Sequence, residues 1–69
     1  MSDSRLRYRI QFGVYNDRAV YCADWTTVML VGHALRKAGW KELAAYNNDR
    51  ADCDTTGLTE SEREEWEAV

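Results

Sequence analysis

Arginines recur at alternate positions near the start of the chain. Arg5, Arg7 and Arg9 are each separated by one residue, and Arg18 follows after a short gap. Alternate side chains of a β-strand leave the same face at intervals of about 6.6–7 Å, which suits contacts to phosphates or to an acidic partner. The same alternation is also typical of a solvated sheet face or a charge-protected edge. The four arginines are therefore candidate nucleic-acid-binding residues, with a solvated face as the alternative.

Glutamates cluster at the other end of the chain, at Glu60, Glu62, Glu64, Glu65 and Glu67. Paired carboxylates perform acid–base chemistry only where a cleft raises a pKa, and a short terminal helix offers no cleft. An acidic patch can instead mimic nucleic acid or dock on a basic protein surface. We expect these five residues to bind a protein partner with a basic surface, the alternative being a solvated helix face.

The segment 52–57, Asp-Cys-Asp-Thr-Thr-Gly, resembles the opening of an EF-hand calcium loop. Asp, Asp and Thr stand at its first, third and fifth positions and Gly at the sixth. The twelfth position holds Arg63, where the calcium loop needs a carboxylate. We therefore expect an Asx turn and no metal or cofactor, with Asp52 and Asp54 as weak candidates for a calcium site.

The remaining chemically reactive side chains stand apart from one another. His33, Cys22 and Cys53 have no partners at metal-ligand or triad spacing, and there is no phosphate-binding loop or nucleophile elbow. We interpret Cys22 as a strand residue packed as a small hydrophobe, Cys53 as a loop residue and His33 as a surface residue. A chain of 69 residues offers no deep cleft, so the sequence indicates a non-enzymatic protein.

A β-hairpin over 5–25 would position the arginines. Apolar residues fill the even positions 6–14 opposite the arginines, which is the period of a half-buried strand, and we expect 8, 10, 12 and 14 to be buried. A two-residue turn at Asn16-Asp17 would set Arg9 opposite Asp24 and Phe12 opposite Tyr21. The return strand then turns residues 19, 21 and 23 inward. A four-residue loop would move the pairs but keep the same faces.

Two helices are predicted. The first covers 27–38, with a Thr at its N-cap and Gly39 at C′, and its Gly32 would permit close approach to the hairpin. The second covers 60–68 behind a capping box of Thr59 and Glu62, with Trp66 as its anchor.

The segment 40–46 fits either a strand or a helix, followed by a loop over 47–58. A third strand is favoured because an isolated two-stranded ribbon is barely stable. The whole chain, 1–69, is then a single α+β domain of order ββαβα.

Charge divides unevenly along the chain. Residues 1–41 carry seven basic side chains and three aspartates, whereas 42–69 carry two arginines and nine acids, for a net charge of −3. This asymmetry predicts opposite electrostatic faces or docking of one half on the other. The sequence has no run of 18 apolar residues and no signal peptide, so we expect a soluble, cytoplasmic monomer or homodimer.

Small size, acidity and many aromatic residues are together typical of accessory proteins from phages and mobile elements, anti-CRISPR proteins among them. The sequence thus favours a non-enzymatic regulator or inhibitor that binds a protein, such as a host nucleic-acid machine, through its acidic surface. A nucleic-acid-binding protein using the arginine-lined face is the alternative, and a calcium-binding module is the second alternative.

Overall fold

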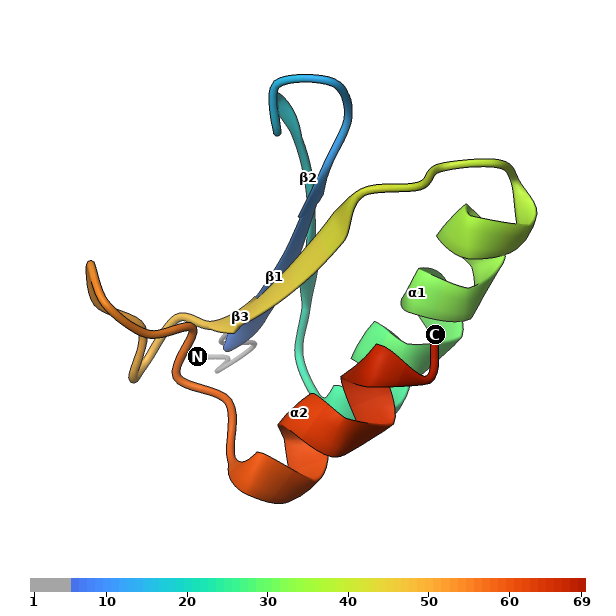
Figure 1. Ribbon diagram of the computed structural model, residues 1–69. Coiled ribbons are helices and arrows are strands. Elements are labelled where there is room, and N and C mark those ends of the chain that lie inside the picture. Colours follow the sequence, from blue (N-terminus) through green and yellow to red (C-terminus); the bar gives the residue numbers. More distant parts are fainter. Residues whose placement is uncertain (1–5) are drawn as a thin grey trace, which may run out of the picture.

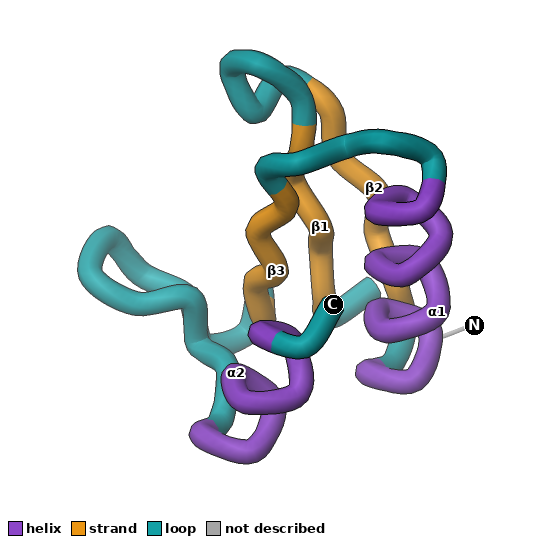
Figure 2. The backbone as a smooth tube through the Cα atoms, turned by 45° about the vertical axis from the view of Figure 1, so that its right-hand side comes forward, coloured by secondary structure: helices purple, strands orange, loops and turns teal. Residues whose placement is uncertain are grey.

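The computed structural model describes residues 6–69 and has an α+β fold with the predicted order ββαβα. Its elements are β1 (Tyr8–Phe12), β2 (Arg18–Cys22), α1 (Trp25–Lys37), β3 (Leu43–Asn47) and α2 (Glu60–Glu67). The strands form one antiparallel sheet of order β2-β1-β3, so the third strand is confirmed, although it begins at Leu43 and not at residue 40. Both helices lie on the same side of this sheet (Figures 1 and 2), and neither is long and apolar enough to cross a membrane.

The core lies between the sheet and α1. Ile10 and Phe12 of β1 are buried with Cys22, Val28 and Ala45. Partly buried side chains of the strands, both helices and the loops pack around them: Tyr8, Val20, Trp25, Val31, Leu35, Trp40, Leu43, Leu58 and Trp66. The even positions of β1 therefore face the helices, which leaves its odd positions, with the arginines, on the other side of the sheet.

The pairing of β1 with β2 differs from the predicted register. Ile10 pairs with Val20, and Arg9 pairs with Tyr21 rather than with Asp24. The observed register is three residues away from the predicted one. Because strand side chains alternate between faces, an odd shift turns every β2 residue to the opposite side. The residues predicted to face inward, 19, 21 and 23, are therefore exposed.

The cause of the shift is a connection of five residues, 13–17, instead of two or four. Gly13 has a φ of 102°, and its carbonyl accepts from the N–H of Asn16, whose φ is 56°. The chain thus turns one residue after Phe12, around Val14 and Tyr15. Burial of Val14 was predicted wrongly, because this side chain is 80% exposed at the centre of the turn.

Helix α1 begins two residues before its predicted start. The Asp24 carboxylate accepts from the N–H of Thr27, so Asp24 rather than a threonine is the N-cap. At the other end, the N–H of Gly39 donates to Arg36 and that of Trp40 to Leu35. These are the two bonds of a Schellman motif, with Gly39 in the predicted C′ position at a φ of 109°.

Helix α2 has the predicted capping box of Thr59 and Glu62. It lies beside α1, where a Cβ atom built on Gly32 would be 2.5 Å from the ring of Trp66. Gly32 therefore makes room for α2. The prediction that Gly32 permits close approach to the hairpin is wrong, because its close neighbour is Trp66.

Candidate partner-binding surfaces

One row of side chains crosses the outer face of the sheet, which neither helix covers. Arg9 in the central strand is paired with Tyr21 of β2 and with Tyr46 of β3. Directly paired residues in antiparallel strands point to the same face. The Arg9 guanidinium lies 4.3 Å from the centre of the Tyr46 ring and donates to the side-chain oxygen of Asn48. The three side chains therefore form a continuous aromatic and cationic row.

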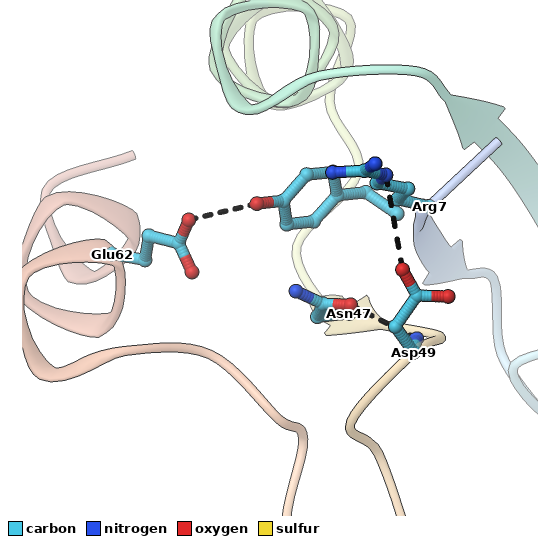
Figure 3. A network of polar contacts seen from close by, with 5 residues as sticks. Arg7, Asn47, Asp49 and Glu62 are labelled. Carbon is cyan, nitrogen blue, oxygen red and sulfur yellow. Dashed lines mark hydrogen bonds and ion pairs between the residues drawn. The ribbon is translucent and has the colours of Figure 1, made fainter. Parts of the chain in front are cut away.

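The predicted arginine set is divided by the fold. Arg7 stands two residues before Arg9, so strand alternation puts it on the same face. It forms an ion pair with Asp49 (Figure 3), with 3.8 Å between Arg7 Nε and Asp49 Oδ2. Arg18 pairs with Phe12 and so belongs to the helix side, where its guanidinium lies 5.5 Å from the centre of the Trp40 ring. Arg5 lies outside the described residues. The outer face thus gathers Arg7 and Arg9 but not Arg18.

The predicted acidic set is also divided. The Tyr8 hydroxyl donates to Glu62 at 2.9 Å (Figure 3), and Trp25 Nε1 donates to Glu65 at 2.7 Å. Burial and the hydrogen bond to Glu62 both raise the pKa of Tyr8 above its usual range. These two glutamates dock α2 on neutral donors of β1 and α1, whereas the other three, Glu60, Glu64 and Glu67, are exposed around Arg63.

The end of the molecule that holds the hairpin turn carries a third surface. The turn exposes 80% of Val14 and 85% of Tyr15. The Schellman motif fixes Trp40 next to it, with its ring edge-on to Phe12 at 5.0 Å between centroids. Between them is an open notch of about 240 Å³, lined by Gly13, Val14, Gly39, Trp40, Lys41 and Glu42. We call Val14, Tyr15 and Trp40 the hairpin pole.

The loop over 52–57 uses its first carboxylate internally. Asp52 Oδ1 accepts from the N–H groups of Asp54 and Thr55, which is an Asx turn. Within residues 6–69 no three His, Cys, Asp or Glu side chains gather closely enough to hold a metal ion.

Cys22 is buried in the core and Cys53 is exposed in the loop over 52–57, both as free thiols. Burial raises the pKa of the Cys22 thiol, and the nearby Asp24 adds to this.

Comparison with protein-family models finds no matching family, and comparisons with curated proteins and with solved structures find no match.

Sequence reasoning missed the two outer-face tyrosines and the hairpin pole. Tyr21 was predicted to be internal because the turn was placed at Asn16-Asp17. The signal that could have corrected this was Gly13, since a glycine directly after an alternating strand is often where a positive φ ends the ladder. Once Gly13 starts the turn, Val14 and Tyr15 must lie at its exposed centre.

Proposed function

We propose that this domain is a non-enzymatic regulator or inhibitor that binds a protein partner through the hairpin pole. The observation that carries this proposal is the exposure of Val14 and Tyr15 beside the Trp40 notch. Apolar side chains gathered on an exposed surface are typical of interaction sites, and Tyr and Trp are enriched among the residues that dominate binding energy.

The turn itself does not require these two residues. Gly13 and Asn16 supply the positive φ angles, so the geometry leaves the intervening side chains free to be polar, as hairpin turns usually are. Val14 and Tyr15 contribute little to the core at their exposures of 80% and 85%. Their apolar character is accounted for by burial against a partner.

A partner side chain that enters the notch would contact the Trp40 ring and Val14, and the exposed Tyr15 next to Val14 would add contact area. The notch of about 240 Å³ has room for one large apolar side chain. Arg18 above the Trp40 ring and Lys41 at the rim supply donors for carbonyl or carboxylate groups of the partner. This arrangement places an apolar anchor inside a polar rim, as in many protein interfaces.

The acidic face of α2 is a second candidate contact, for a partner with a basic surface. Glu60, Glu64 and Glu67 are spaced by four and three residues and therefore share one side of the helix. They are exposed and lie away from the two glutamates that dock α2. An inhibitor of a nucleic-acid machine would use such carboxylates in place of phosphates.

The experiment is affinity capture from the source cell, with the parent and a Val14→Ser, Tyr15→Ser double variant, followed by mass spectrometry. We expect the parent to retain a specific protein that the double variant loses. Leu30→Ser is the matched control, because Leu30 is 68% exposed on α1 and lies outside the pole. Retention of the partner by the double variant, or its equal loss with Leu30→Ser, would contradict the proposal.

Charge reversal tests the second contact separately. Glu60→Lys, Glu64→Lys and Glu67→Lys together should slow association with a basic partner, more at low salt than at high salt, because exposed charges are screened beyond about 8–10 Å. Glu62 and Glu65 are left unchanged because they hold α2 in place. Unchanged association kinetics would remove this face from the proposal.

A further inference from the structure

We propose that the outer face of the sheet binds single-stranded nucleic acid on the row Tyr21–Arg9–Tyr46. This inference is independent of the hairpin pole and concerns a different side of the molecule. It rests on the register of the three strands, the stacking of Arg9 on Tyr46 and the exposure of Tyr21.

The row has the spacing and surroundings of a stacking platform. Neighbouring strands lie about 4.7–4.9 Å apart, so the two tyrosines stand about 10 Å from each other across Arg9. Beside the row, Gln11 pairs with Ala19 and with Ala44, so the next layer of the face has two small side chains. The ring of Tyr21 and the stacked pair of Arg9 and Tyr46 therefore rise above these smaller neighbours. Such a row matches about two or three unstacked bases.

The side chains offer both kinds of contact that a single strand needs. Tyr21, at 54% exposure, presents a ring on which a base can stack. The Arg9 guanidinium lies against Tyr46 and has an exposed hydrogen bond to Asn48, so its outer plane and remaining N–H groups can meet a second base or a phosphate. Arg7, with its side chain 59% exposed, is the second cation of this face.

The charge of the paired strand positions differs in sign from that of the whole chain. The paired positions of β1, β2 and β3 on the outer face contain no Asp or Glu. The nearest acids follow the end of β3: Asp49 beside Arg7, and Asp52 and Asp54, which line a shallow hollow with Tyr46. Five of the twelve acids are the glutamates of α2, which docks on the opposite side of the sheet through Tyr8 and Trp25. A phosphate backbone that crosses the paired positions therefore contacts Arg9, and the sheet lies between this backbone and the acidic helix.

A duplex does not fit this chemistry as well as a single strand. Bases inside a duplex are stacked on one another and present only their edges in the grooves. A flat row of π-faces instead recognises bases that are splayed out, largely irrespective of sequence. The inferred ligand is thus a short single strand, of DNA or of RNA.

Fluorescence anisotropy with labelled oligothymidylate, oligouridylate and a duplex of equal length tests the inference. We expect the full chain to bind the DNA strand, the RNA strand or both, and to bind the duplex more weakly. If two arginines contact phosphates, the logarithm of the association constant should fall with the logarithm of the salt concentration with a slope of about −1.4. Tyr21→Ala should weaken binding about tenfold, since stacking on one aromatic ring is lost.

Matched tyrosine variants separate the ring from general effects. Tyr21→Phe keeps the ring and should bind like the parent. Tyr15→Ala removes a tyrosine that is even more exposed, at 85%, but lies in the hairpin turn, and it should leave oligonucleotide affinity unchanged. Because Tyr15 belongs to the hairpin pole, its replacement affects the proposed protein binding alone, so failure of one proposal is distinguishable from failure of the other.

Several results would overturn the inference. The parent would fail to bind a single strand at low ionic strength, or would bind the duplex as tightly as the single strand. Tyr21→Ala would bind oligonucleotide as tightly as the parent, or Tyr15→Ala and Tyr21→Ala would lose the same amount of affinity. Loss of a captured protein partner on Tyr21→Ala, with no oligonucleotide binding by the parent, would instead assign the outer face to a protein.

Discussion

Replacing Gly32 with alanine tests how the two helices pack, because two opposing effects meet at this residue. Alanine in the interior of α1 should stabilise the helix by about 1 kcal/mol relative to glycine. The added methyl group, however, would lie 2.5 Å from Cζ3 and 2.9 Å from Cη2 of Trp66. Carbon atoms normally pack at about 3.5–4.0 Å, so the indole ring must move by about 1 Å or more.

Trp66 is not free to make this movement without loss. Its ring packs edge-on against Trp25 at 6.4 Å between centroids, and α2 is held by the bonds of Glu62 to Tyr8 and of Glu65 to Trp25. Overpacking of this kind typically costs about 1–3 kcal/mol. Subtracting the gain in helix propensity, we expect Gly32→Ala to lower the free energy of unfolding of the parent by about 0–2 kcal/mol.

The sign should reverse when Trp66 is shortened. In a Trp66→Leu background the atoms that clash are absent, and Gly32→Ala should raise stability by about 1 kcal/mol. Urea melts followed by far-UV circular dichroism measure all four proteins of this double-mutant cycle. The resulting coupling of about 1–3 kcal/mol is typical of residues in direct contact.

His33→Ala is the matched control, since His33 is the next residue of α1 and its side chain is exposed. His33→Ala should change the free energy of unfolding by the same amount in the parent and in the Trp66→Leu variant. If Gly32→Ala stabilises the parent as much as it stabilises the Trp66→Leu variant, Trp66 of α2 does not pack against Gly32 of α1.

Other predictions concern the core, a cap and the terminal segment. Phe12→Ala should cost about 3–5 kcal/mol in a urea melt, since Phe12 is only 7% exposed, and parent-like stability would contradict its place in the core. Hydrogen bonds from Thr27 lower the pKa of the Asp24 carboxyl in the folded protein. The ionised Asp24 cap therefore stabilises the fold fully above the ordinary carboxyl pKa, and this stabilisation is lost as the pH falls through the lowered pKa. The stability difference between the parent and Asp24→Ala should therefore narrow in acid, and a constant difference across pH would exclude this role. Deleting 59–69 should lower the melting temperature and increase binding of a hydrophobic dye, whereas an unchanged melting temperature would mean that Trp66 anchors nothing.

Local patterns by themselves determined which elements form. The alternation around Ile10 specified β1, the Thr59–Glu62 pair specified the start of α2, and Gly39 specified the end of α1. Each of these depends on residues within a few positions of one another, so sequence spacing carries the information. The third strand also followed, because a sheet of two strands is barely stable alone.

Tertiary structure decided how those elements meet, and with it the candidate surfaces. A five-residue connection rather than a two-residue turn moved Tyr21 to the outer face beside Arg9, since an odd change of register exchanges the two faces of a strand. Gly32 makes room for Trp66 of α2. Glu62 accepts a hydrogen bond from Tyr8 and Glu65 accepts one from Trp25, so these two glutamates dock α2 instead of belonging to the acidic patch. These pairs are separated by 34 to 54 positions in the chain, so no local spacing records them.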